Sequence, residues 1–195
     1  MEAKLLDIEL PTLGSGNNPR SDGLHLTDII RDLMNKSGLA PEKSNWNRQA
    51  VFGAGFVWEE VIATYWEEVF SIALAQVLGR KFSWFSTGEL CKDGIYCTPD
   101  GLDVGHKTWV VQEAKFTWKS SKNKPVDNWY FTTQNKAYCY VVGCVEAVIH
   151  VYYCMGDYKG SGPIYEPWYF SYKPHELQEN WEMLCNHAAK MREVK

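Results

Sequence analysis

The sequence of 195 residues contains no long apolar run, no internal repeat and no excess of basic residues. No segment approaches the roughly 20 apolar residues of a membrane-spanning helix. The first residues, Met-Glu-Ala-Lys-Leu-Leu-Asp, lack the basic start and the apolar block of a secretory signal. We therefore expect a cytoplasmic protein with no membrane partner. The formal net charge of −4 weighs against a protein that coats nucleic acid non-specifically, although a local basic patch remains compatible with it.

Several sequence signatures of catalysis are also missing. None of the six cysteines forms a Cys-x-x-Cys pair, so we expect free, mostly buried thiols rather than an iron–sulfur cluster. The sequence has no P-loop, no dinucleotide-binding fingerprint and no pattern typical of Ser-His-Asp or Cys-His catalysis. The chemistry therefore has to be sought among carboxylates and lysines. Nine Trp and eleven Tyr are present, which can fill a core or stack on bases.

The order of the expected elements predicts one α/β domain that spans residues 1–195 and is built on a single sheet. Residues 1–23 are polar and rich in Gly, Asn, Ser and Pro, so we expect a mobile N-terminal segment. The expected helices are Thr27–Gly38, a long central helix at Ala54–Leu78, Trp129–Val142 and Pro174–Arg192. The expected strands are Lys81–Ser86, Gly94–Thr98, Thr108–Gln112 and the apolar run Val145–Met155, with loops at 39–50, 119–128 and 156–173.

Two carboxylates flank a predicted pair of strands. Asp100 lies in the turn Thr98-Pro99-Asp100-Gly101-Leu102, and Glu113 ends the apolar stretch Trp-Val-Val-Gln-Glu. If the two strands are adjacent, both carboxylates reach the same part of the sheet. They would repel each other there unless a positive charge lay between them. A hard divalent cation, which takes oxygen ligands, fills that role well.

Lys115 follows Glu113 by two residues, and positions two apart in a strand point to the same face. A lysine beside a metal suits the cleavage of a phosphodiester. The metal activates water, and the lysine orients that water and offsets the charge that develops. Taken alone, each motif has a plainer interpretation, because a Glu-x-Lys pair is usually a solvated surface pair and a Pro-Asp-Gly sequence is usually only a turn. The order and spacing of the two motifs on consecutive strands favour the functional interpretation.

A third acid lies on the long predicted helix. On a helical wheel the apolar centre falls between Trp58, Val69 and Ile72, and Glu60 and Glu67 fall on the wet face. Glu59 falls at the boundary of the core, on the side of Trp66 and Phe70, where a carboxylate needs a partner. Glu59 could join the metal site directly or through water.

Polar residues of the next helix and the loop before it complete the set. Gln134 and Tyr138 are four apart and share a helix face, which could also be an ordinary surface. The loop carries Lys119, Lys122 and Lys124, which could track phosphates or simply be solvated.

These four motifs, in this order, resemble the RecB-like branch of the PD-(D/E)XK nucleases, and within it the phage lambda-exonuclease and YqaJ group of recombination nucleases. The resemblance covers about residues 24–155. The motifs are Gly55-x-x-x-Glu59, Pro99-Asp100-Gly101, Glu113-Ala114-Lys115 and Gln134-x-x-x-Tyr138. The resemblance implies a restriction-endonuclease-like core, with a central mixed sheet flanked by helices. Asp103 is a second acid near the turn, but Asp100 carries the Pro-Asp-Gly match.

The resemblance also implies a role for each residue. Asp100, Glu113 and the Ala114 carbonyl would bind Mg²⁺ or Mn²⁺, with Glu59 in support, and Lys115 would orient or activate water. Gln134 and Tyr138 would steady the catalytic residues or the DNA backbone.

The function expected from the sequence is a metal-dependent deoxyribonuclease, an exonuclease in phage or bacterial recombination, repair or DNA processing. An endonuclease and a non-catalytic DNA- or protein-binding module on the same fold are the alternatives. DNA is the expected partner. The short chain also suggests a homo-oligomer, or help from a recombinase or a single-strand-binding protein.

Overall fold

The computed structural model describes residues 20–39, 48–105, 108–160 and 162–193, without the side chains of residues 48–52. Most of the expected mobile segment 1–23 therefore lies outside the described residues. The helical elements are α1 (Leu26–Lys36), α2 (Arg48–Thr64), the π-helical turn η1 (Trp66–Phe70), α3 (Ser71–Leu78), the 3₁₀ turn η2 (Pro125–Asp127), α4 (Trp129–Val142) and α5 (Pro174–Glu193). The strands are β1 (Leu24–His25), β2 (Leu90–Lys92), β3 (Ile95–Cys97), β4 (Gly101–Asp103), β5 (Val110–Thr117), β6 (Glu146–Tyr153) and β7 (Ile164–Ser171).

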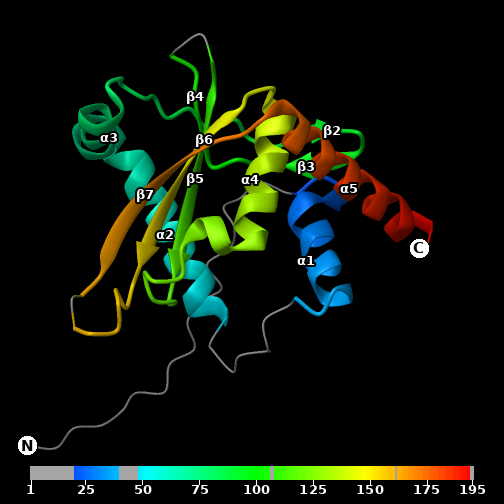
Figure 1. The fold of residues 1–195 in the computed structure, drawn as a ribbon, viewed down its shortest axis with the longest axis horizontal. Coiled ribbons are helices and arrows are strands. Elements are labelled where there is room, and N and C mark those ends of the chain that lie inside the picture. The colour runs from blue at the N-terminus through cyan, green and yellow to red at the C-terminus, as the bar shows by residue number, and fades with distance from the viewer. Residues whose placement is uncertain (1–19, 40–47, 106–107, 161, 194–195) are drawn as a thin grey trace, which may run out of the picture.

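The chain forms a single α/β domain around a four-stranded mixed sheet in the order β4-β5-β6-β7 (Figure 1). The β5–β6 pair is parallel, and both outer pairs are antiparallel. Helix α4 connects the parallel strands, as a crossover must. A small second sheet, β1-β3-β2, lies beside α1 and α5. The expected fold class is confirmed, although the structure has two sheets rather than one.

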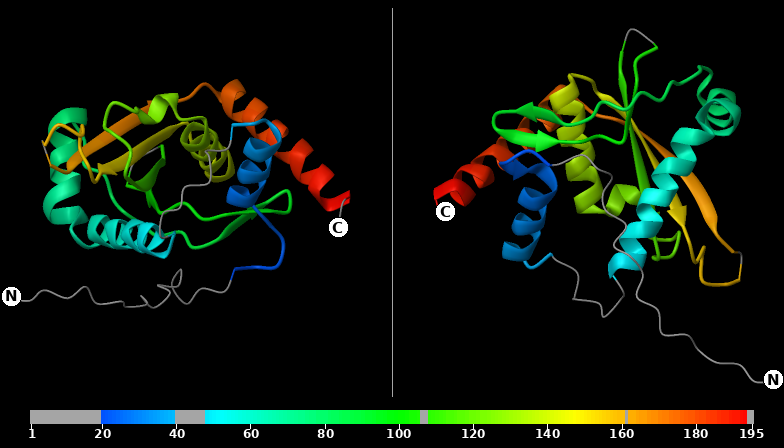
Figure 2. Two further views of the ribbon diagram at one scale, coloured as in Figure 1. Left: turned by 90° about the horizontal axis from the view of Figure 1, so that it is seen from below. Right: turned by 180° about the vertical axis from the view of Figure 1, so that it is seen from behind.

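The main sheet is covered on both faces (Figure 2). On one face, Val111 and Ala147 pack against α1, α4 and α5 in the larger core cluster. On the other face, Val110 and Val148 pack against α2, η1 and α3. The strands β5 and β6 are therefore covered on both sides, which explains the nearly continuous apolar sequence of β6.

The long helix expected at Ala54–Leu78 is wrong as a single element. The helix axis bends by 66° between Thr64 and Trp66. The π turn that follows shifts the helical phase, so that Trp66 and Phe70 face the sheet, and the Trp66 indole donates to the Phe82 carbonyl at 2.8 Å.

The bend also overturns the predicted apolar centre of this helix. Val69 and Ile72, which were expected at that centre, are 51% and 46% exposed. Trp58, which precedes the bend, is buried as expected. Glu60 and Glu67 are exposed, and Glu59 lies half-buried at the edge of the core, as expected.

Two further expectations need correction. The predicted loop 156–173 contains β7, which pairs with β6 along its whole length. Its Pro167 suggested a loop, but proline is tolerated on an edge strand, and β7 is an edge strand. The predicted strand Lys81–Ser86 forms only one bridge, between Phe85 and Leu102, because the Ser83 amide and hydroxyl bond instead to the Asp103 carboxylate.

The remaining expectations are confirmed in part. The helices α1, α4 and α5 match the predicted ranges within two residues, whereas α2 begins at Arg48, inside the predicted loop 39–50. Strand β5 continues to Thr117, beyond the predicted end at Gln112. All six cysteines are free as expected, but only three of them are buried. In the described part of the chain, no single helix is long and apolar enough to cross a membrane. The segments Gly53–Thr64 and Trp66–Leu78 pass that test only as a bent pair.

A buried polar pair joins the two central strands on the α2 face. The His150 ring is fully buried, and its nitrogens lie 2.8 Å from the Tyr165 hydroxyl and 2.8 Å from the Gln112 amide oxygen. The rings of Trp66 and Phe70 meet it edge-on. Burial lowers the pKa of His150 to about 3, so the imidazole is neutral in the folded protein at any ordinary pH.

The neutral state of His150 predicts a loss of stability in acid. The unfolded chain protonates this imidazole near pH 6.5, whereas the folded protein resists protonation down to about pH 3. The free energy of unfolding should therefore fall by up to about 1.4 kcal/mol per pH unit as pH drops through this window. His150→Gln should flatten that slope in urea titrations between pH 7 and pH 4, whereas the exposed control His175→Gln should keep it. Equal slopes for His150→Gln and wild type would contradict the prediction.

Candidate active site

The candidate site is built where β4 begins. Pairing of β4 with β5 begins at Gly101, opposite Gln112, so the edge of β5 is open from Glu113 onward on that side. The Ala114 amide, which would have bonded to a longer β4, donates instead to the Asp100 carboxylate at 2.8 Å. In an extended strand the amide and the carbonyl of one residue face the same edge, so the Ala114 carbonyl also faces this opening.

Glu113 and Lys115 point to the same face of β5, as the two-residue spacing predicts. The Lys115 ammonium bonds to Glu113 Oε1, and the side chains of Lys115 and Glu113 are only 16% and 3% exposed. The second carboxylate oxygen of Glu113 is buried and has no hydrogen-bond partner among the described residues. A buried carboxylate oxygen without a partner is costly, and such an atom is suited to a cation. Glu113 lies inside β5 rather than at its end, because the strand continues to Thr117.

The electrostatics of the site are those of crowded, buried acids. Burial and then the nearby Asp100 charge raise the pKa of Glu113 to about 8. Burial and the same Asp100 charge raise the pKa of Glu59 to about 7, and burial raises the pKa of Asp100. Burial disfavours the Lys115 ammonium, but the Glu113 and Asp100 charges outweigh this and raise the pKa of Lys115. A single ammonium therefore lies among three carboxyl groups, so a further positive charge would be favourable in this site.

Glu59 reaches this site from α2. Its charge interacts with those of Asp100 and Lys115, so the structure brings all four predicted residues into one electrostatic group. No three His, Cys, Asp or Glu side chains gather closely enough to hold a metal ion in the described part of the chain. The prediction of Glu59 as a direct metal ligand thus has no geometric support. The residues that could hold a cation are Asp100, Glu113 and the Ala114 carbonyl.

Gln134 and Tyr138 lie on the face of α4 that covers this site. The Gln134 amide donates to the Tyr138 hydroxyl at 2.8 Å, and both side chains are buried. Burial, together with the charges of Glu113 and Asp100, raises the pKa of Tyr138 well above its usual value. The interpretation of these two residues as an ordinary solvated helix surface is therefore wrong. Gln134 Oε1 is buried without a partner among the described residues.

Phe131 is a site residue that the sequence motifs did not indicate. The Lys115 ammonium lies 5.5 Å from the centroid of its ring, within the range of a cation–π contact. Phe131 precedes Gln134 by three residues, and this helical spacing is the signal that could have identified it.

The three loop lysines lie outside this group. Lys119, Lys122 and Lys124 are exposed on the loop between β5 and α4. No salt bridge involves them in the described residues.

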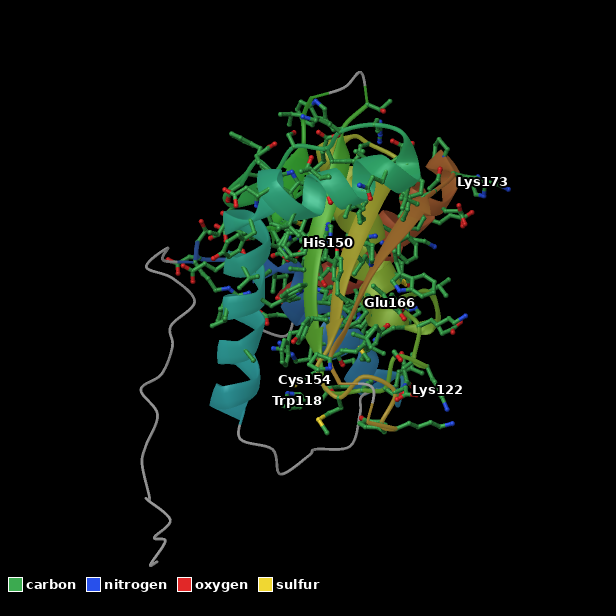
Figure 3. The ribbon with its side chains drawn as sticks, turned by 90° about the vertical axis from the view of Figure 1, so that its left-hand side faces the viewer. Trp118, Lys122, His150, Cys154, Glu166 and Lys173 are labelled. Carbon is green, nitrogen blue, oxygen red and sulfur yellow. The ribbon has the colours of Figure 1, made fainter. Side chains whose placement is uncertain are left out.

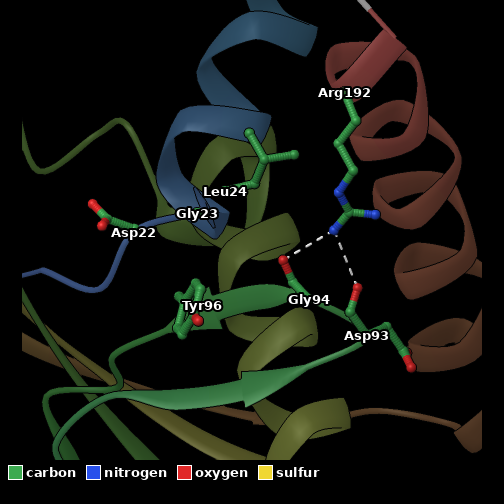
Figure 4. Close-up of a pocket in the computed structure, with 7 residues that line it drawn as sticks. All are labelled: Asp22, Gly23, Leu24, Asp93, Gly94, Tyr96 and Arg192. Carbon is green, nitrogen blue, oxygen red and sulfur yellow. Dashed lines mark hydrogen bonds between the residues drawn. The ribbon is translucent and has the colours of Figure 1, made fainter. Parts of the chain in front are cut away.

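A separate cavity of about 470 Å³ lies between β1, the β2–β3 turn and the end of α5 (Figure 4). Arg192 donates there to the carbonyls of Asp93 and Gly94 at 3.2 and 2.9 Å. None of the predicted site residues lines it.

Asp103, the neighbouring acid that could have been mistaken for Asp100, has a different role. It is fully buried, and its Oδ1 atom accepts hydrogen bonds from the Ser83 amide at 2.8 Å, the Ser83 hydroxyl at 2.7 Å and the Gly105 amide at 3.2 Å. Asp103 thus fastens the segment after α3 to the β4 turn.

Asp103→Ala should therefore destabilise the fold. Removing an ionised acceptor of three hydrogen bonds should lower the free energy of unfolding by at least about 3 kcal/mol, measured by urea denaturation. Asp127→Ala, at an exposed aspartate, is the matched control and should change it by less than about 0.5 kcal/mol. A loss below about 1 kcal/mol for Asp103→Ala would refute this structural role.

Comparison with known proteins shows what this arrangement is similar to. No family model matches the chain, and no curated protein matches it. Among solved structures, a phage related exonuclease from Haemophilus somnus 129PT superposes with a TM-score of 0.52 at 13% identity, covering 87% of this chain and 83% of its own. A protein designated SSO0001 superposes over 91% of this chain and 79% of its own, with 11% identity and a TM-score of 0.45, too low to support an argument. The chain therefore shares the fold of the phage related exonuclease.

Proposed function

We propose that the protein is a divalent-metal-dependent deoxyribonuclease of the PD-(D/E)XK type. The observation that carries the proposal is the convergence of Asp100, Glu113 and Lys115 where β4 begins, with one Glu113 oxygen buried and without a partner among the described residues. A divalent cation on that oxygen would relieve the repulsion that raises the pKa values of the acids. The shared fold with a phage related exonuclease supports cleavage from DNA ends.

The residues present fit Mg²⁺ or Mn²⁺, held by Asp100, Glu113 and the Ala114 carbonyl with water completing the shell. When bound, such an ion supplies an activated water and a Lewis acid for the phosphoryl oxygen. Lys115 remains protonated, so its ammonium orients the nucleophile and neutralises charge that develops on the phosphate. The Phe131 ring holds the Lys115 ammonium by a cation–π contact, and the hydrogen-bonded Gln134–Tyr138 pair on α4 covers the site.

Glu59 supports the site without touching the metal. Its half-buried carboxylate interacts with Asp100 and Lys115, and its pKa of about 7 allows it to accept a proton near neutrality. We further propose that DNA is the substrate and that Lys119, Lys122 and Lys124 contact its phosphates. A role in phage or bacterial recombination or repair, in the cytoplasm, and association with a recombinase, a single-strand-binding protein or further copies of the chain follow only from the resemblance of the motifs.

Metal binding should stabilise the wild-type protein. Saturating Mn²⁺ should raise its thermal midpoint by about 5 °C or more, because the ion binds only the folded site. Glu113→Gln, which keeps the shape but removes the charge, should abolish the shift in differential scanning fluorimetry. Glu60→Gln, on the exposed face of α2, should retain it. A shift of wild-type size in Glu113→Gln would place the metal elsewhere.

Cleavage assays test the activity itself. End-labelled linear DNA and closed circular DNA are incubated with Mg²⁺ or Mn²⁺, and Lys115→Ala and Glu113→Ala are compared with wild type and Glu60→Gln. We expect loss of linear DNA alone, with turnover at least about 100-fold lower in both site variants. Cutting of circles would favour an endonuclease on the same fold. No cleavage of any DNA by wild type would favour a non-catalytic binding module.

A further inference from the structure

Four exposed lysines surround one end of the main sheet. Lys119, Lys122 and Lys124 lie between β5 and α4, and Lys159 lies between β6 and β7. No salt bridge involves any of the four in the ranges that the structure describes. The same two loops contain two acids, Asp127 and Asp157, so the lysines outnumber them. In a protein of net charge −4 this is a local excess of positive charge.

The two loops that carry these lysines are fastened to each other. Three hydrogen bonds cross between them: the Ser121 amide to the Gly156 carbonyl at 2.9 Å, the Tyr153 hydroxyl to the Asn123 carbonyl at 3.1 Å, and the Tyr158 hydroxyl to the Trp118 carbonyl. Figure 3 shows Trp118, Lys122 and Cys154 together at this end of the molecule, far from Lys173. The lysines therefore project from a fixed base, which reduces the entropy lost when they bind a ligand.

Contacts with neighbouring side chains add to this order. The Lys124 ammonium lies 5.8 Å from the centroid of the Trp168 ring on β7. Two acids near these lysines are also ordered by hydrogen bonds: Asp157 Oδ1 accepts from the Lys159 backbone amide at 2.8 Å, and Glu166 accepts from the Trp168 indole at 3.1 Å.

The register of the sheet fixes how far these lysines are from the candidate active site. Glu113 is opposite Ile149, which is opposite Trp168, so Glu113 and Trp168 share a face about 10 Å apart. Lys119 follows Lys115 by four residues, so the Lys119 backbone is within about 13 Å of the Lys115 backbone. The Trp168 ring that Lys124 contacts is on a strand about 10 Å from Glu113. A DNA strand with one phosphate at Glu113 can therefore bring the phosphates a few nucleotides away to these lysines.

We infer that Lys119, Lys122, Lys124 and Lys159 form a lysine platform that holds phosphates of the cleaved DNA strand beyond the scissile one. This inference rests on the proposed nuclease function. It adds Lys159, and it makes the platform the part of the site that selects longer substrates over short ones. Because the platform contacts phosphates and not bases, its contribution is independent of sequence and falls with salt.

The test compares the quadruple variant Lys119→Gln/Lys122→Gln/Lys124→Gln/Lys159→Gln with wild type on a single-stranded 30-mer and on a dinucleotide without terminal phosphates. For the 30-mer, KM at 0.15 M salt should rise about tenfold or more with kcat within about twofold. The slope of log KM against log salt should fall by about two to three. For the dinucleotide, whose only phosphate is the scissile one, KM should be unchanged. Lys173→Gln/Lys190→Gln, at two exposed lysines outside the platform, is the matched control.

Fluorescence anisotropy with a labelled 30-mer supplies a second readout in the Glu113→Gln background, where cleavage is removed. The quadruple change should weaken binding about tenfold, and circular dichroism should show that the variant is folded. An unchanged KM, salt slope and affinity in a folded quadruple variant would overturn the platform, even if wild type cleaves DNA. If wild type cleaves nothing but lysine-dependent binding persists, the platform stands and the proposed nuclease function fails.

Discussion

The hydrogen bond from the Ala114 amide to the Asp100 carboxylate organises the site on which the proposed function depends. It forms because the pairing of β4 with β5 begins only at Gly101, so the Ala114 amide of β5 is satisfied by a side chain rather than by backbone. The same bond brings Asp100 next to Glu113, which creates a buried pair of like charges. The late start of a strand thus produces the acidic site, and Lys115, Glu59 and the α4 residues are arranged around it.

Burial rather than exposure defines the chemistry of this region. An exposed Glu113 and Lys115 would form a weak surface ion pair. Here the site lies between the main sheet and the α4 residues Tyr138, Gln134 and Phe131, so its charges interact strongly. The buried Glu113 oxygen, which has no partner among the described residues, would be stabilised by a bound cation. The lysine platform is the opposite case, with exposed ammonium groups on a fixed base. In the proposed function, the buried site cleaves the phosphodiester and the lysine platform binds the DNA backbone.

The sequence predicted local features well and long-range geometry less well. Helix α4 was predicted to the residue, since its cap and aromatic pattern are local. The shared face of Glu113 and Lys115 follows from strand geometry alone. The bend at Tyr65 could not be predicted from the sequence, because it depends on the hydrogen bond from the Trp66 indole to the distant Phe82 carbonyl. As a result Val69, which was predicted to be buried, is exposed. The spacing of Phe131 and Gln134 places both on one face of α4, but the contact of Phe131 with Lys115 and the position of Glu59 relative to the other acids depend on packing between elements.

The outer strand β7 has a consequence for how copies of this protein can meet. Its Pro167 cannot donate a hydrogen bond, so a strand from another chain that docked along this edge would find the ladder interrupted at its middle. Continuous sheets that run through several molecules, and the aggregates that grow from them, are therefore disfavoured at this border. Any assembly of identical copies that uses this border therefore depends on side-chain contacts rather than on strand pairing.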